Sequence, residues 1–383
     1  MKKIISFSFL LLFSLSVFSQ IKYNKFSTRI KYAQFNPAFQ FDATLVDEID
    51  DQSGYMLSSQ YDDQSGGVHP TLVKLDIDGN ILFDSIYEFV PNNFSGGMQL
   101  MHSHTSLTNH IMMFVSDLHG PLGQSPAAPY IINMDLNGNI NWQIGLQDDT
   151  LELVPTRIVN TQDGGYAIAG GMWDGGSSQQ QKQAGFIIKL DASGNILWDS
   201  LYRKTDTISY EFNAMVETPG GGLLVAGTAH QYHNGTDTPL LLVKMNSSGS
   251  VIWSKVQKLA APILPNYGPD EINLGMINNT DAIVSYEVHN SSFVREIAMT
   301  SFNTITGVNN WTKTYASGSE AEMTRAAFDG KGNVVINAMD STDQSVTYRF
   351  DDQGNYIGAK KLQQKFLLKC MSNLKKNILM VRN

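Results

Sequence analysis

The sequence predicts an all-β fold, a seven-bladed β-propeller of four-stranded antiparallel blades. Three observations predict it. A hairpin pattern recurs with a period of about 55 residues, a period typical of propellers and solenoids. A second pair of strand-like segments precedes each hairpin. Only 16% of the residues are charged and 32 are glycine, which favours a turn-rich β protein over a helical one.

The hairpin is clearest at Phe186–Tyr202, which reads FIIKLDASGNILWDSLY. Two alternating apolar runs flank a Ser-Gly-Asn turn, as expected for paired strands. Gly194 is expected to supply the positive φ of the turn, and Asp191 to hydrogen-bond the turn amides through its side chain. The turn glycines of the six copies are Gly79, Gly138, Gly194, Gly249, Gly307 and Gly354.

The segment before each hairpin also reads as two strands joined by a Gly- or Asn-containing turn. With the hairpin, it gives four strands per unit, which is one propeller blade. This segment occurs seven times, against six hairpins. The copies begin at Asp50, Thr105, Asn160, Glu217, Asn278, Asp329 and Ser372.

The seventh segment needs partners, because sheets avoid exposed edges. Ile21–Phe35 alternates like a strand, so we expect it to complete the last blade and close the ring. The two chain ends would then share one sheet. The alternative is six blades followed by a stray hairpin.

An aromatic residue follows the turn in five copies: Phe83, Trp142, Trp198, Trp253 and Trp311. A tryptophan side chain buries about 150–250 Å². Since one blade cannot bury both of its faces, we expect these rings to pack between neighbouring blades. Trp173 falls outside this register, in a polar loop, and is a candidate ligand-binding residue.

The N-terminus predicts export. Met1–Ser19 has two lysines followed by an apolar run, as a secretory signal peptide does, and leaves residues 20–383 as one propeller domain. No later run is long and apolar enough to span a membrane. We expect a secreted monomer in the periplasm, at the cell surface or outside the cell.

Charge and cysteine content exclude several classes of protein. A formal net charge of −9 disfavours nucleic-acid binding, because nothing would replace the phosphate counterions. Cys370 is the one cysteine, so neither an intramolecular disulfide nor a cysteine-based zinc site is possible.

The hairpin resembles the repeat of pyrroloquinoline-quinone-type (PQQ-like) propellers, in which an acidic residue, a Thr-Gly turn and a docking tryptophan recur. Asn303, Thr306, Gly307 and Trp311 match that spacing, and the other copies run one residue shorter. The chain also resembles secreted propellers of bacteria with type IX secretion. The resemblance implies a fold. The quinone-dependent enzymes of that family often need a pair of adjacent cysteines, and this chain has Cys370 alone. We therefore expect no cofactor here.

Several polar residues are candidates for ligand binding. His102 and His104 alternate on an expected inner strand, so both imidazoles lie on one face and form either a metal site or, as we favour, a polar lining of the central channel. His230, Tyr232 and His233 share a variable loop.

Other candidates involve carboxylates. Asp76 and Asp78 resemble the start of a calcium loop, but the other copies vary at the second position, which favours a role in the turn. The pairs Asp270/Glu271 and Glu320/Glu322 lie where inner strands are expected to begin. They are the residues an acid–base mechanism on a glycan would use.

We therefore expect an exported, non-catalytic module that binds a protein or a surface glycan. The expected binding surface is the rim of polar loops, since propeller function usually lies in variable loops on one face or at the channel mouth. These loops are Tyr61–Pro70, Asp117–Pro129, Met172–Gln183 and Ala229–Pro239. The alternatives are a polysaccharide-acting enzyme with carboxylates at the channel mouth, and a structural component of an envelope assembly.

Overall fold

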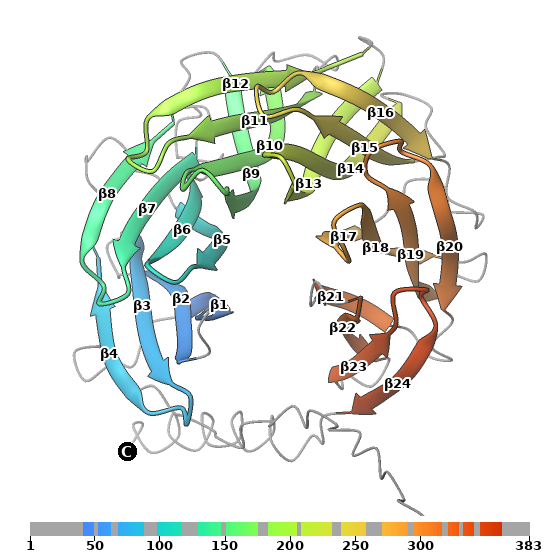
Figure 1. Cartoon of the computed structure of the whole chain (residues 1–383). Coiled ribbons are helices and arrows are strands. Elements are labelled where there is room, and N and C mark those ends of the chain that lie inside the picture. The colour runs from blue at the N-terminus through green and yellow to red at the C-terminus, as the bar shows by residue number, and fades with distance from the viewer. Residues whose placement is uncertain are drawn as a thin grey trace, which may run out of the picture.

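The computed structural model describes residues 41–49, 53–62, 68–87, 98–116, 129–146, 151–174, 183–204, 208–231, 239–257, 270–289, 294–315, 321–328, 332–340 and 345–361. Over these ranges the chain forms 24 strands in six four-stranded antiparallel sheets. Figure 1 shows the sheets arranged radially as propeller blades, with the first strand of each nearest the axis and the fourth outermost. No helix long and apolar enough to cross a membrane occurs in these ranges.

Each blade is a run of four consecutive strands. Blades 1 to 3 consist of β1 (Phe41–Glu48), β2 (Gly54–Asp62), β3 (Val68–Asp76), β4 (Ile81–Ile86); β5 (Met98–Thr105), β6 (Asn109–Ser116), β7 (Pro129–Asp135), β8 (Ile140–Gly145); and β9 (Leu151–Asn160), β10 (Tyr166–Asp174), β11 (Gln183–Leu190), β12 (Ile196–Tyr202). Blades 4 to 6 consist of β13 (Ile208–Thr218), β14 (Gly222–Gln231), β15 (Leu240–Met245), β16 (Val251–Gln257); β17 (Asp270–Met276), β18 (Asp281–His289), β19 (Arg295–Asn303), β20 (Asn309–Tyr315); and β21 (Ala321–Phe328), β22 (Val334–Asp340), β23 (Ser345–Phe350), β24 (Tyr356–Lys361).

The turn between the third and fourth strands is held by one side chain. Between β11 and β12, Asp191 Oδ1 accepts hydrogen bonds from the backbone N–H groups of Ser193 and Asn195, at 2.8 and 2.9 Å. Gly194 has a φ of 85°, and the turn glycines of the other five blades have φ between 67° and 84°. The predicted left-handed conformation at these glycines is confirmed.

Each outer-strand aromatic lies on the turn of the next blade. The Trp142 indole covers Gly194, where a methyl group would lie 2.9 Å from the ring, and its Nε1 donates to the carbonyl oxygen of Ala192 at 2.9 Å. Close packing therefore requires glycine at this turn as much as the positive φ does. The same contact joins Phe83 to Gly138, Trp198 to Gly249, Trp253 to Gly307 and Trp311 to Gly354.

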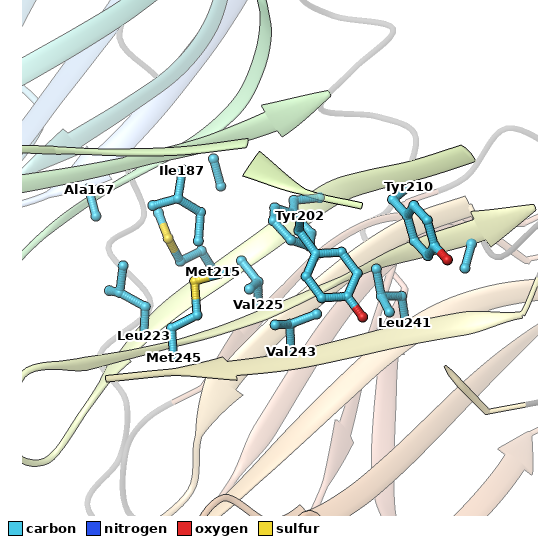
Figure 2. Close-up of a cluster of buried hydrophobic side chains, with 13 residues drawn as sticks. Ala167, Ile187, Tyr202, Tyr210, Met215, Leu223, Val225, Leu241, Val243 and Met245 are labelled. Carbon is cyan, nitrogen blue, oxygen red and sulfur yellow. The ribbon is translucent and has the colours of Figure 1, made fainter. Parts of the chain in front are cut away.

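Five hydrophobic clusters fill the interfaces between successive blades. Figure 2 shows the cluster between blades 3 and 4, where Ala167 and Ile187 lie in the same core as Met215 and Val225. A blade of this kind is apolar on both faces, so it gains stability from its neighbours rather than from its own sheet.

The prediction of seven blades is wrong, because the described chain forms six. Each of these six blades uses four consecutive strands, so none joins the two chain ends. A local alternating pattern identifies a strand but does not identify its partner, and this is why the count failed. The prediction of a seventh blade depended on two segments that lie outside the described residues: Ile21–Phe35 and the segment from Ser372.

Candidate functional site

The six inner strands lie nearest the propeller axis (Figure 1), and each carries an irregularity in its pairing. In β5 one residue is skipped between Leu100 and His102, and in β21 one is skipped between Met323 and Arg325. The same break precedes Arg157 in β9. Such β-bulges redirect side chains and are over-represented beside active sites.

Each bulge frees a backbone group, which the preceding blade satisfies in three places. Gln60 Oε1 accepts the N–H of Leu100 at 2.6 Å, and Glu287 Oε2 accepts that of Met323 at 2.8 Å. Thr156 Oγ1 donates to the carbonyl oxygen of Phe212 at 2.6 Å. These bonds fix the bulges and tie adjacent blades together near the axis.

The first paired residue after the bulge is basic in three blades: His102 in blade 2, Arg157 in blade 3 and Arg325 in blade 6. Their equivalent register places them at one level around the axis. Arg157 and Arg325 act on each other electrostatically, although two blades separate them along the chain. The charges of side chains from different blades therefore act on one another near the axis.

An acidic residue, Asp47 of β1, joins this group. Its Oδ2 accepts a short hydrogen bond from Ser103 Oγ of the next blade. Burial raises the pKa of Asp47, while the Ser103 hydrogen bond and the charges of His104, Arg325 and Arg157 oppose that rise. We call Asp47, His102, His104, Arg157 and Arg325 the inner ring.

Burial also governs the bases of the inner ring. It lowers the pKa of Arg157 to about 10, with the like charge of Arg325 acting in the same direction. Burial lowers the pKa of His102 well below its usual value, so this imidazole is neutral near pH 7. His102 is 7% exposed, and its Nδ1 has no hydrogen-bond partner among the described residues.

Blade 4 adds polar atoms to the inner strands. Asn213 is the bulge residue of β13, and its Nδ2 donates to Glu211 Oε1 at 3.2 Å. Its Oδ1 and the Ser209 hydroxyl are buried without a partner in the described part of the chain. Burial raises the pKa of Glu211, and the bond from Asn213 partly offsets the rise.

A second polar cluster, Ser58–His110–Thr105, has the hydrogen bonds of a nucleophile–base pair. Ser58 Oγ lies 2.7 Å from His110 Nε2, and Thr105 Oγ1 lies 2.7 Å from His110 Nδ1. All three side chains are buried, with Ser58 and His110 at 0% exposure. Burial lowers the pKa of His110 to about 3. Substrate has no access to this cluster, so it is a structural link between blades 1 and 2.

The sequence-predicted ligand residues have different outcomes. His102 and His104 lie in β5 within the inner ring, and their role in binding stays a prediction. His230 and Trp173 lie in strands β14 and β10, but their side chains are outside the described part. Tyr232 and His233 also lie outside the described residues, as does most of each predicted binding loop.

The predicted carboxylate pairs are only partly described. Glu271 is exposed and has a φ of 50°. The side chains of Asp270 and Glu322, and all of Glu320, lie outside the described residues.

The calcium candidate has a different role in the structure. Asp76 Oδ1 accepts the N–H groups of Asp78 and Asn80 at 2.9 and 2.8 Å, and Oδ2 accepts Asn80 Nδ2. These bonds lower the pKa of Asp76, the Asn80 side-chain bond most of all. Within the described ranges no group of three or more His, Cys, Asp or Glu side chains is placed to hold a metal.

Sequence reasoning missed Asp47, Arg157 and Arg325. A signal was present: His102, Arg157 and Arg325 each lie three residues before the last residue of an inner strand. Aligning the strands backward from the turn that follows them brings the three bases into register. Aligning the strands from their first residues misplaces Arg157, because β9 begins two residues earlier, relative to its bulge, than β5 and β21 do.

No protein-family model matches the chain, and no curated protein is similar to it in sequence. Among solved structures, a protein of unknown function from Dyadobacter fermentans matches 85% of this chain and 95% of its own, with 10% identity and a TM-score of 0.46. An α-L-arabinanase from Penicillium chrysogenum matches 83% of this chain and 96% of its own, with 12% identity and a TM-score of 0.48. The WD40 domain of Toxoplasma gondii coronin matches 83% and 70%, with 10% identity and a TM-score of 0.49.

Proposed function

We propose that the protein is an exported, non-catalytic β-propeller that binds a glycan or a protein at the inner ring. One observation supports the proposal: His102, Arg157 and Arg325 share one register position on the inner strands of blades 2, 3 and 6, the charges of both arginines act on His102 and on Asp47 of blade 1, and His102 Nδ1 is buried without a partner among the described residues. Convergent polar groups on a rigid scaffold are what a binding site requires.

The sequence supports the rest of the proposal. Met1–Ser19 has the pattern of a signal peptide, and a pI of about 5.3 fits a partner other than nucleic acid. Gly307 and Trp311 support a relationship to PQQ-like propellers and to the secreted propellers of bacteria with type IX secretion. From that relationship we infer a propeller fold and export from the cytoplasm, and we expect no cofactor.

The test uses the mature chain, residues 20–383, on a glycan array and in affinity capture from envelope extracts. Retention of a glycan or a protein, lost when Arg157 is changed to Met, is the expected result. Binding that is unaffected by Arg157→Met and by Arg325→Met would show that the site lies elsewhere. No retention in either assay would refute a binding module.

Polysaccharide hydrolysis is the competing function, and Glu211 is the observation that favours it. A carboxyl group whose pKa burial has raised suits a general acid. Product release should be assayed on the same glycans. Hydrolysis that disappears in Glu211→Gln, while binding persists, would replace a binding module with an enzyme.

A further inference from the structure

Two lysines occupy equivalent positions in blades 3 and 4. Lys189 of β11 and Lys244 of β15 each pair with the tryptophan of the outer strand beside them. Each Nζ also contacts the threonine that precedes the turn between the first two strands of its own blade. A methyl group added at Gly165 or at Gly222 would lie 2.7 or 2.9 Å from the respective nitrogen. The surroundings of the two ammonium groups can therefore be compared position by position.

In blade 3 the turn supplies a carboxylate to its lysine. Lys189 Nζ lies 2.8 Å from Asp163 Oδ2. Thr161 Oγ1 and the Gly165 N–H donate to Asp163 Oδ1, at 2.6 and 3.0 Å. Burial acts to raise the pKa of Asp163, but hydrogen bonds from the lysine, the threonine and the backbone together lower it to about 2. The carboxylate is thus held firmly in its charged form beside the ammonium group.

The equivalent turn of blade 4 has no such carboxylate. Counted from the threonine, Gly220 stands at the position of Asp163. Thr218 Oγ1 donates instead to the carbonyl oxygen of Gly222 at 2.9 Å. Among the described residues, that hydroxyl is the one hydrogen-bond partner of Lys244 Nζ, which forms no ion pair. A largely buried ammonium group without an ion pair is costly, and a carboxylate would remove that cost.

Glu217 does not take the place of the missing carboxylate. Burial lowers the pKa of Lys244 to about 8, and the charge of Glu217 opposes the fall. The two side chains form no ion pair in the described part of the chain, because Glu217 Oε2 accepts the Gln162 N–H of blade 3 at 2.7 Å. Glu217 therefore links the two blades and leaves the Lys244 ammonium group available.

The position of the missing carboxylate is open to solvent. The Asp163 side chain is 56% exposed although Lys189 is 5% exposed, so the alkyl chain of this lysine is buried and its ammonium group ends at the surface. Lys244 is 8% exposed, and a methyl group added at Gly220 would meet no atom within 4 Å. A carboxylate can therefore approach Lys244 from the solvent side of the turn.

We propose that blade 4 binds a carboxylate carried by another molecule, which takes the place of Asp163 and pairs with Lys244 Nζ. A monoanion matches a single ammonium group, and Asp163 shows how blade 3 holds one. The site lies on the third strand and on the turn between β13 and β14. It is separate from the inner ring, so the inference does not depend on the proposed function.

Competitive acylation tests the site. The mature chain is treated at pH 8 with limiting N-acetoxysuccinimide, and peptide mass spectrometry gives the acetylation rates of individual lysines. An ion pair raises the pKa of an amine and so reduces its nucleophilic, neutral fraction. Saturating acetate should therefore slow acylation of Lys244 at least threefold relative to chloride at equal ionic strength, and uncharged acetamide should not.

Two lysines in the same sample serve as controls. Lys189 already has a carboxylate, and Lys204 is an exposed lysine just beyond β12, so acetate should leave both rates unchanged. An unchanged rate at Lys244 would overturn the inference. Equal slowing of all three lysines would also overturn it, because acetate would then act on the reagent rather than on a site.

Asp163→Ala tests the comparison between the two turns. The variant creates in blade 3 the vacancy that blade 4 has naturally, so acetate should now slow acylation of Lys189 as it does that of Lys244. Thermal melting confirms that the variant is folded. A Lys189 rate that stays insensitive to acetate in the folded variant would contradict the equivalence on which the inference rests.

Two further ligands identify the source of the carboxylate. Oligoglutamate that protects Lys244 at a tenfold lower concentration of carboxylate groups than acetate would assign the site to an acidic segment of a protein. Equal protection at equal carboxylate concentration would assign it to small free acids. Inorganic phosphate that protects better than acetate would overturn the preference for a carboxylate. None of these outcomes bears on the inner ring, which the glycan array and the affinity capture test separately.

Discussion

At the scale of single residues, buried histidines show how burial sets chemistry. His110 has both ring nitrogens engaged by hydroxyls and is 0% exposed, so protonation would place a charge where no water can reach it. The pKa of this imidazole therefore falls to about 3. The group that resembles a catalytic base is a neutral cross-link between two blades.

The pKa of His110 predicts acid sensitivity. In the unfolded chain this histidine is protonated below about pH 6.5, whereas in the folded chain it stays neutral down to about pH 3. The free energy of unfolding should therefore fall as the pH drops below 6.5, by about 1.4 kcal/mol per pH unit for this residue. His102 shifts in the same direction. Urea unfolding at pH 7, 6 and 5 measures the slope.

His110→Gln provides the control for this slope. Glutamine keeps hydrogen-bonding capacity at the site but does not titrate, so the variant's stability should depend less on pH than that of the wild type. An identical pH dependence in the two proteins would contradict the assignment.

Gly194 separates backbone strain from steric contact. Gly194→Ala forces a side chain into a positive φ and into the Trp142 ring. Gly220 has a φ of 89° but no atom within 4 Å of the added methyl group. Gly220→Ala should cost about 1–2 kcal/mol, for the conformation alone, and Gly194→Ala about 3 kcal/mol or more. Chemical denaturation measures the free energy of unfolding of both variants. Equal losses would show that the Trp142 ring moves aside without cost.

At the scale of elements, the inner-strand bulge is the unit that connects fold and site. In blades 2, 3 and 6 a basic residue follows it, and in blades 2, 4 and 6 the preceding blade binds a backbone group beside it through Gln60, Thr156 or Glu287. The same irregularity thus positions the inner ring and ties the blades together.

Glu287 tests that connection. It is 3% exposed, accepts the Met323 N–H and lies 3.4 Å from Arg295 Nε. Glu287→Ala leaves the buried Met323 amide unpaired and should cost about 3 kcal/mol. Glu287→Gln keeps an acceptor and should cost less, while Glu48→Ala, at an exposed carboxylate, should stay within about 0.5 kcal/mol. Equal losses in the first two variants would show that the charge, rather than the amide bond, matters.

At the scale of the whole molecule, the sequence predicts what is local and fails on what is not. The Gly-Asn hairpin predicts the four-stranded unit and the left-handed glycines, and both are confirmed. The predicted number of blades was wrong, because an alternating pattern, such as the one from Ser372, does not tell which segment it would pair with. Arg157 and Arg325 were missed for a similar reason: their shared position after the bulge depends on how each strand pairs, which the strand's own sequence does not give.

Trp198 tests the joint between blades. Its ring covers Gly249 and belongs to the core between blades 3 and 4, and its Nε1 donates to the Ser247 carbonyl oxygen at 3.1 Å. Trp198→Ala should lower the free energy of unfolding by about 3 kcal/mol. Leu201→Ala is the control, since Leu201 lies on the same strand and is 52% exposed. Comparable losses in the two variants would mean that the Trp198 indole stabilises the fold no more than an exposed side chain does.

Because every described blade is drawn from adjacent stretches of chain, a sheet can be finished soon after its own residues emerge. Each completed blade then presents an apolar face and, from its outer strand, an aromatic ring on which the turn of the following blade can pack. Assembly can therefore advance blade by blade from the N-terminal blade, without waiting for the rest of the chain.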